Sequence, residues 1–223
     1  MPHFLKIIKF SFVIPIVILA AVSPLKAEDG KFMFSINGGI SYNAGTGAYE
    51  SYWQPIFNLG GGVGYKVASF IVPQLYVDYS LFSLDTGSYK GTLSICRYDY
   101  ANCSVNGGNL SFTTVATTVK FLIPRGKTQF SPYARPGFGY SRGMKDKITA
   151  HYSGDINDNT LLPADDIWES ETMNAMFLTL GLGFDYYLSP KACLFIESEI
   201  TMGIYQMSGT GFIPVKLGMS FWI

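Results

Sequence analysis

The sequence predicts an all-β fold, an eight-stranded antiparallel up-and-down β-barrel that crosses a membrane with its strands. Three observations favour this fold. Charged residues make up only 14% of the chain, well below the ~25% of ordinary soluble proteins, while aromatic residues reach 16%. Apolar residues alternate with polar or small ones along eight segments, which is the period of a β-strand. The apolar rows of these segments carry no charged side chain, whereas the opposite rows carry eight.

The same composition excludes two other classes of protein. A disordered chain needs high charge and few aromatic residues, which is the reverse of what is found here. A nucleic-acid-binding domain needs an excess of basic residues to neutralise phosphates, and the formal net charge of this chain is zero.

Residues 1–27 have the order of a secretory signal peptide. Lys6 and Lys9 precede an apolar run over residues 10–22, and Ala27 provides a small residue for cleavage before two acidic residues. A membrane-spanning helix would need ~20 apolar residues, and Pro15 and Pro24 interrupt this run. We therefore expect cleavage near Ala27, export of the mature chain, and a barrel domain over residues 28–223.

The expected strands span residues 31–42, 57–67, 74–81, 114–123, 130–141, 176–188, 194–204 and 213–223. In each of them, alternate residues form a mainly apolar row. Each outward row can be represented by two of its apolar residues. In strand order these are Phe34 and Ile36, Leu59 and Val67, Leu75 and Val77, Val115 and Val119, Phe130 and Phe138, Leu180 and Leu182, Ile196 and Ile200, and Leu217 and Phe221. Two prolines in the fifth segment, Pro132 and Pro136, remove ladder donors, and Ser198 interrupts an otherwise apolar row.

The inward rows carry charges of both signs and equal number, and we expect them to form an ion-paired network in the lumen. They are Lys66, Asp78, Lys120, Arg135, Asp185, Glu197, Glu199 and Lys216. Matched pairs suit a narrow lumen because an unpaired buried charge is costly. A gated pore lined by these charges is the functional alternative. Glu197 and Glu199 also resemble an acid–base pair, but a substrate would have no access to them.

Glycine and bulky aromatic residues share the inward rows. An eight-stranded barrel is only wide enough for side chains, so the glycines are expected to make room for Tyr76, Tyr133, Phe177, Tyr187 and Trp222. Aromatic residues at the strand ends suit the girdles at the two membrane interfaces.

The connections between strands alternate in length. Residues 68–73, 124–128 and 189–191 are short turns, whereas residues 43–56, 83–109 and 142–173 are long and residues 205–211 are intermediate. Short periplasmic turns and long outer loops are typical of outer-membrane barrels. With eight strands, both chain ends are expected on the short-turn side.

Several of these segments resemble the small outer-membrane barrels: the transmembrane domain of outer-membrane protein A and the opacity-type and attachment proteins. The resemblance covers essentially all of residues 28–223 and is carried by residues 132–140, 181–190 and 215–223. Members of this family end in an alternating aromatic strand that the barrel-assembly machinery recognises, which implies that machinery as a partner during insertion. Their last residue is typically Phe, whereas Ile223 stands here after Phe221 and Trp222.

Three cysteines occur in a chain that we expect to be exported. Cys96 and Cys103 lie close together in the second long loop, and an oxidising compartment favours a disulfide between them. Cys193 has no evident partner and is expected to fill apolar space. The cysteines do not supply enough ligands for a metal site.

The third long loop contains two weak motifs. His151, Ser153 and Asp155 contain the residue types of a catalytic triad, but no nucleophile turn accompanies them. Residues 155–159 resemble the start of a calcium loop, yet Thr160 replaces the required glycine. We therefore expect no catalytic site, no cofactor and no bound metal.

These observations favour a non-enzymatic, monomeric outer-membrane barrel with a structural or surface-interaction role of the adhesin or opacity type. Outer-membrane lipid and lipopolysaccharide are its expected surroundings, and an extracellular partner could bind the loops, where Trp53 and Trp168 lie. No nucleic acid is expected. A narrow channel for small or apolar solutes is the alternative, and a lipid-modifying barrel enzyme is a more distant one.

Overall fold

A computed structural model describes residues 32–44, 52–91, 93, 96, 102–123, 128–152, 165–205 and 211–223. The expected signal peptide, the cleavage site and the calcium-loop motif lie outside these residues. Within them, no helix is long and apolar enough to cross a membrane.

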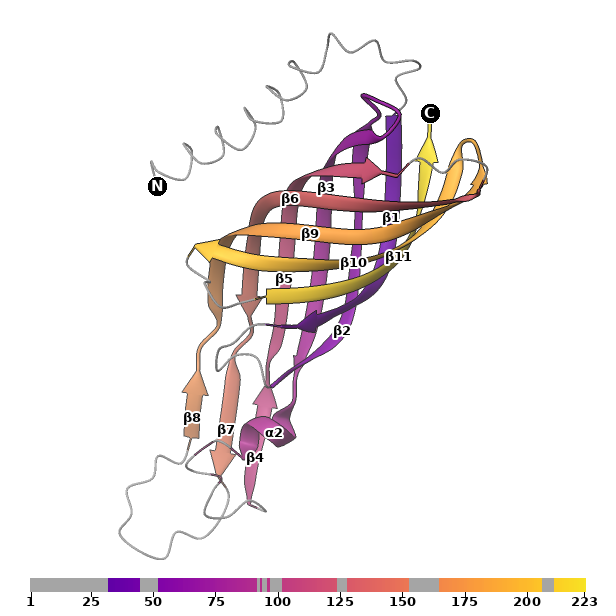
Figure 1. Ribbon diagram of the computed structural model, residues 1–223. Coiled ribbons are helices and arrows are strands. Elements are labelled where there is room, and N and C mark those ends of the chain that lie inside the picture. Colours follow the sequence, from indigo (N-terminus) through magenta and orange to yellow (C-terminus); the bar gives the residue numbers. More distant parts are fainter. Residues whose placement is uncertain are drawn as a thin grey trace, which may run out of the picture.

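Eight strands form a closed antiparallel barrel, which confirms the predicted fold class. Around the barrel the order is β1-β11-β10-β9-β6-β5-β3-β2, so each strand pairs with the next barrel strand in the chain, and β1 closes the ring against β11 (Figure 1). The strands are β1 (Phe32–Asn43), β2 (Trp53–Tyr65), β3 (Ile71–Leu84), β5 (Asn109–Leu122), β6 (Phe130–Lys145), β9 (Glu171–Ser189), β10 (Ala192–Tyr205) and β11 (Gly211–Trp222).

The barrel is apolar outside and charged inside. On β11, Leu217 is 64% exposed while its neighbour Lys216 is 1% exposed; on β9, Leu182 is 61% exposed while Asp185 is fully buried. Such an arrangement would be unstable in water, but it suits a barrel whose outer surface meets hydrocarbon chains, where each exposed charge would cost ~2–4 kcal/mol. The predicted outward and inward rows hold along the barrel strands except at the end of the second expected strand, where Lys66 and Val67 lie.

The exception in the outward row is Val67, which was expected to continue that row of the second strand. β2 ends at Tyr65, and the chain then turns so that the Val67 N–H donates to the carbonyl of Ile71 at 3.1 Å. Val67 is consequently buried. Apolar–polar alternation predicts which way a side chain points only as far as the strand is paired, because a turn rotates the following side chains away from the pleat.

The second proline of β6, Pro136, is accommodated by a local gap in pairing. The residue pairs between β5 and β6 stop at Thr118–Gly137 and resume at Phe121–Ala134, so the gap includes Pro136. On its other side β6 pairs with β9 without interruption, including Pro132 opposite Phe184. The barrel therefore tolerates the missing N–H group of Pro136 by giving up part of one ladder.

The long loops are more structured than expected. The sequence predicted residues 83–109 and 142–173 as loops, but they contain a second sheet of three strands, in the order β4-β7-β8, and a short helix. These elements are β4 (Cys103–Gly107), β7 (Ile148–Tyr152), β8 (Asp165–Trp168) and α2 (Thr86–Lys90). They project beyond the barrel as a separate layer, which we call the outer platform (Figure 1).

Candidate functional site

Two parts of the molecule carry the candidate sites: the barrel lumen, with its charges, and the outer platform. Of the eight charged residues predicted to line the lumen, the structure buries seven. The seven are Asp78, Lys120, Arg135, Asp185, Glu197, Glu199 and Lys216.

The centre of the lumen holds a continuous ion-paired network. Arg135 on β6 contacts both Glu197 and Glu199 on β10, and its Nη2 lies 2.5 Å from Glu199 Oε2. Lys216 on β11 then bridges Glu199, at 3.2 Å, and Asp78 on β3, at 2.6 Å. Side chains from four strands, β3, β6, β10 and β11, are thereby connected inside the barrel.

Aromatic rings lie beside these cations. The guanidinium of Arg135 lies 4.3 Å from the ring centroid of Tyr76, and the ammonium of Lys216 lies 4.9 Å from the same ring. The Tyr133 hydroxyl donates to Glu197 at 2.9 Å. The network is therefore held by hydrogen bonds and cation–π contacts as well as by charge.

A second, smaller pair lies nearer the short turns. Lys120 on β5 bonds Asp185 on β9 at 2.7 Å, and its ammonium lies 3.8 Å from the ring centroid of Tyr133. Lys66, the eighth predicted member, is half-buried and lies outside both groups. It pairs with no carboxylate among the described residues and instead lies 5.9 Å from the ring centroid of Trp222. Its position just past the end of β2 explains why it does not point into the network.

Apolar side chains close the lumen at both ends. Toward the short turns, the closing cluster contains Met33, Val72, Leu122, Tyr133, Phe195 and Trp222. Toward the long loops, Phe82, Phe112 and Phe212 form a group of rings with centroids 4.6 to 6.1 Å apart. Sequence reasoning missed this second group. The signal was available, because Phe82 and Phe112 continue the inward rows of their strands beyond the predicted limits.

Inward glycines make the packing possible. A Cβ on Gly139 would lie 2.6 Å from the ring of Phe177, and one on Gly183 would lie 2.6 Å from the ring of Tyr133. Within the described residues, the lumen retains a cavity of about 10 Å³ bordered by Tyr76, Arg135 and Glu197. This is room for about one water molecule.

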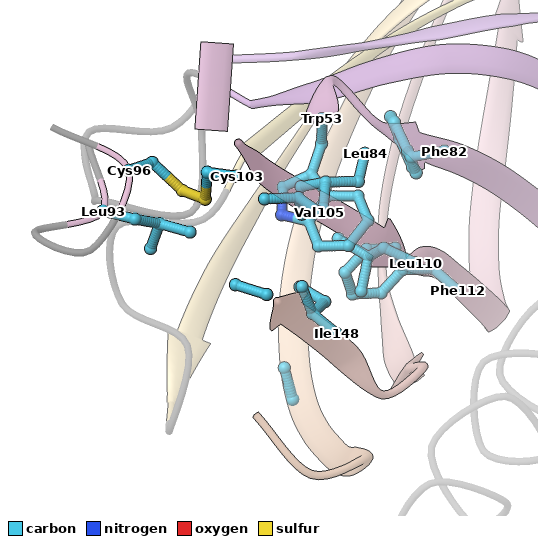
Figure 2. Packing of buried hydrophobic residues seen from close by; sticks show 12 residues of the cluster. Trp53, Phe82, Leu84, Leu93, Cys96, Cys103, Val105, Leu110, Phe112 and Ile148 are labelled. Atoms are coloured by element: carbon cyan, nitrogen blue, oxygen red, sulfur yellow. A yellow bond between two sulfur atoms is a disulfide. The ribbon is translucent and has the colours of Figure 1, made fainter. Parts of the chain in front are cut away.

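The outer platform is built like a small water-soluble protein. One face of its sheet, including Val105 and Ile148, packs on Trp53 and Leu84 from the ends of β2 and β3 (Figure 2). Cys96 and Cys103, with Cα atoms 5.2 Å apart, are joined by a disulfide at the edge of this cluster. The apolar core of the platform is continuous with the phenylalanine group that closes the barrel.

The other face of the platform sheet is polar and exposed. Ser104 and Asn106 on β4 and His151 on β7 point outward there. Beside the sheet, the ring of Tyr89 contacts the rings of Tyr52 and Trp168 edge to face, with centroids 5.4 and 5.7 Å apart, respectively. We call these three half-buried residues the aromatic strip.

One expectation about the platform is wrong. Trp53 was considered an exposed loop residue able to anchor a partner, but it begins β2 and is buried in the platform core. Trp168, the other tryptophan named on that basis, ends β8 and remains half-buried at the surface. Pairing of residues 103–107 with residues 148–152 creates the pocket for Trp53, and a single-sequence pattern does not reveal that pairing.

The weaker motifs acquire no further support. His151 lies in β7, while Ser153, Asp155 and the calcium-loop motif lie outside the described residues. No group of three or more His, Cys, Asp or Glu residues in the described ranges could hold a metal ion. Cys193 is a free, buried thiol near the start of β10.

The exposed platform also has a charged rim. Lys145 bonds Glu171 at 3.1 Å, and Lys147 lies 3.4 Å from Glu169. Asp85 caps α2 by accepting from the N–H and the hydroxyl of Ser88, and these hydrogen bonds lower the pKa of the Asp85 carboxyl below its usual value. The chemistry at this end is that of a solvated protein surface.

Comparisons with known proteins agree on the architecture. The model of the family described as "Outer membrane protein beta-barrel domain" matches residues 12–213. The structure is similar to that of Neisserial surface protein A, with a TM-score of 0.53 and 11% identity over 86% of this chain and 99% of that one. It is also similar to Ail, the attachment invasion locus protein of Yersinia pestis, with a TM-score of 0.51 and 15% identity over 87% of this chain and 99% of that one. No curated protein matches the sequence significantly.

Proposed function

The chain belongs to the family of outer-membrane β-barrel domains, and on that premise we propose that it is a non-enzymatic surface-interaction protein of the outer membrane. The observation that carries this proposal is the outer platform, which is a packed, disulfide-linked sheet rather than a set of bare loops. The short turns would face the periplasm after export, and the platform would face the outside of the cell.

The construction of the platform suits binding. A surface that is already ordered loses little conformational entropy when a partner docks, so more of the contact energy appears as affinity. The core beneath the sheet and the bond between Cys96 and Cys103 provide this order. The polar sheet face and the aromatic strip then offer hydrogen-bonding groups and amphipathic rings, both of which are common in binding surfaces.

Attachment is one form that this interaction could take. One structural neighbour is described as an attachment invasion locus protein. At 15% identity that likeness establishes the fold alone, so the proposal for this chain depends on its own platform. Outer-membrane lipid and lipopolysaccharide around the barrel, the barrel-assembly machinery during insertion, and a monomeric state complete the proposal.

The lumen argues against the channel alternative. A conducting barrel needs a continuous water-filled path, whereas apolar clusters close both ends here and paired charges fill the middle. Refolded protein in a planar bilayer should therefore show almost no steady conductance. Sustained single-channel currents would contradict this part of the proposal.

The surface role can be tested with cells that display the protein. Wild-type chain and a variant with residues 86–107 and 147–169 replaced by short glycine–serine linkers would be expressed in a non-adherent Gram-negative strain. Adhesion to a cultured epithelial monolayer would be counted for both. We expect a several-fold gain over the empty strain with the wild type and loss of that gain with the variant.

The control measures whether the barrel of the linker variant is still folded. Its shift in electrophoretic mobility on heating, measured in outer-membrane fractions, should be retained by the linker variant. Equal adhesion of the wild-type and linker strains, or no gain with the wild type, would refute the surface role as stated.

A further inference from the structure

The charges enclosed in the barrel do not balance. Between the two apolar clusters, the described residues place three buried cations against four buried carboxylates: Lys120, Arg135 and Lys216 against Asp78, Asp185, Glu197 and Glu199. Lys66 lies beyond the end of β2, and Lys145, at the opposite mouth, bonds Glu171. A net buried negative charge is costly because the low-dielectric interior cannot replace its hydration.

The unbalanced charge can be located by comparing hydrogen-bond partners. Glu199 accepts from Thr179 and Thr201 in addition to its two cations. Glu197 accepts from a tyrosine hydroxyl and from an arginine. Asp78 has one partner, Lys216, on Oδ2, and its buried Oδ1 has no donor among the described residues. Asp185 likewise has a buried Oδ2 without a donor among the described residues, but its cation, Lys120, pairs with no other carboxylate there, whereas Lys216 is shared between Asp78 and Glu199. Asp78 is therefore the least compensated carboxylate of the network.

Two further buried oxygens without a donor among the described residues belong to asparagines on β1 and β2. Asn37 on β1 pairs with Gly60 on β2, which in turn pairs with Asp78 on β3, so the three residues form a row across adjacent strands. Asn58 lies two residues away along β2 and therefore faces the same side. Both asparagines are 3% exposed, and the Oδ1 atom of each lacks a donor among the described residues.

The orientation of the Asn58 amide follows from its other bonds. Nδ2 of Asn58 donates to the hydroxyl of Ser80 at 2.9 Å and to the backbone carbonyl of Tyr79, which only a nitrogen can do. Asn37 has its Nδ2 toward the hydroxyl of Tyr76, a group that can donate as well as accept. In this arrangement both carbonyl oxygens are left as acceptors.

Gly60 provides the space between the three side chains. A Cβ at this position would collide with Oδ1 of Asp78, so the carboxylate lies over the backbone where a side chain would otherwise stand. The carboxylate oxygen of Asp78 thus lies over the backbone of β2 at Gly60. The amide oxygen of Asn37 belongs to the neighbouring strand β1, and that of Asn58 belongs to β2 itself.

We propose that Asn37, Asn58 and Asp78 bind one positive charge, either a proton or a small alkali cation, which balances the lumen. Carboxylate and amide oxygens are the ligands that hard cations prefer. A proton on the Asp78 carboxylate would turn one of its oxygens from an acceptor into a hydrogen-bond donor, which an acceptor oxygen of the same site needs. The charged and titratable groups facing the site from the packed strands are Lys216 on β11, Glu199 on β10, Arg135 on β6 and Tyr76 on β3.

The test compares two buried carboxylates that each bond one lysine and each have one oxygen without a donor among the described residues, but only Asp78 shares its lysine with a second carboxylate. Asp78→Asn should remove the bound charge, whereas Asp185→Asn, the matched control, removes an equally buried carboxylate that is already balanced by Lys120. Wild-type and variant proteins would be folded into phosphatidylcholine vesicles and unfolded with urea. The titrations would replace choline chloride by sodium chloride at constant ionic strength, and separately raise the pH from 5 to 9.

For an alkali cation, the unfolding midpoint of the wild type should rise with sodium, and that rise should vanish in Asp78→Asn and persist in Asp185→Asn. For a proton, sodium should have no specific effect. The unfolding constant should instead increase with pH, by up to about tenfold per unit, because the native state would hold one more proton than the unfolded chain. This slope should likewise vanish only in Asp78→Asn.

Absence of both dependences in the wild type, or their persistence in Asp78→Asn, would overturn the proposal. If Asp78→Asn fails to fold, Asn58→Ala is the second variant, because it removes one acceptor and keeps the bond between Lys216 and Asp78. It should raise the sodium concentration needed for half of the effect about tenfold, or reduce the pH slope. An unchanged response in Asn58→Ala would also count against the site.

Discussion

The barrel and the outer platform place their apolar and polar side chains in opposite directions. In the membrane-spanning half, apolar side chains such as Leu217 face outward and charges such as Lys216 face inward. In the platform, Val105 and Ile148 point inward and Ser104 faces water. The difference follows from the surrounding medium, because hydrocarbon accepts apolar surface without cost, while water drives the same surface into a core.

The two halves consequently differ in how much stability is lost when a contact is removed. In the lumen, removing one member of an ion-paired group leaves a buried charge that water does not reach. In the platform, removing an apolar contact or a covalent link loosens a local structure that is attached to a closed ring of paired strands. Each of the following changes should therefore affect one half and spare the other.

The largest effect is expected for Arg135→Met. Loss of the guanidinium leaves Glu197 and Glu199 without their shared cation, which should cost about 3–5 kcal/mol of unfolding free energy. Urea unfolding in vesicles, followed by tryptophan fluorescence, measures the change. Lys147→Met is the control, since that lysine is half-exposed on the platform, and it should change stability by less than about 0.5 kcal/mol. A small effect of Arg135→Met would mean that the network is hydrated.

Leu180→Arg should have the next largest effect. This side chain lies on the outward face of β9 and is 48% exposed to what we interpret as lipid, so a charge there should cost about 2–4 kcal/mol. The same charge introduced by Ser104→Arg, on the exposed face of the platform, should cost almost nothing. Similar stabilities for the two variants would indicate that water, rather than lipid, surrounds the barrel.

Loss of the disulfide should weaken the platform alone. The paired change Cys96→Ser and Cys103→Ser opens a short loop, for which the chain-entropy estimate is roughly 2–3 kcal/mol. Hydrogen exchange should accelerate in β4 and β7 and remain unchanged in β9 and β10. Uniform acceleration throughout the chain would show that the two halves unfold together.

Gly139→Ala should have the smallest effect of this set. The new methyl group would meet the backbone carbonyl oxygen of Val115 as well as the ring of Phe177, and the crowding should cost about 1–3 kcal/mol. Gly87→Ala is the control because Gly87 lies in the exposed helix of the platform, where the nearest atom is the terminal oxygen of Asp85 at 3.4 Å. An equal effect of the two changes would indicate that the lumen repacks freely around an added methyl group.

Prediction from sequence succeeded for features that depend on one strand alone, such as which way each side chain points. Alternation places Leu182 outside and Asp185 inside without any knowledge of neighbouring strands, and it located all eight barrel strands. It failed for Val67, where the ladder ends, and for Trp53, whose burial depends on segments far away in the chain.

The charge network shows the same limit. The sequence identifies which charges face inward, but the register between strands decides which of them meet. Lys216 reaches Asp78, a residue 138 positions earlier, only because the barrel brings β11 and β3 to the same height in the lumen. Lys66, with the same apparent direction, lies past a strand end and is excluded.

By itself, the amino-acid sequence determined which face of each strand is apolar and which residues were available to fill the lumen, because side-chain direction in a strand is a local property of period two. The pairing of charges, the closure of both ends by aromatic clusters and the sheet above the barrel were decided only by the tertiary structure. These features depend on contacts between segments that are distant along the chain, and ring closure and strand register set those contacts together.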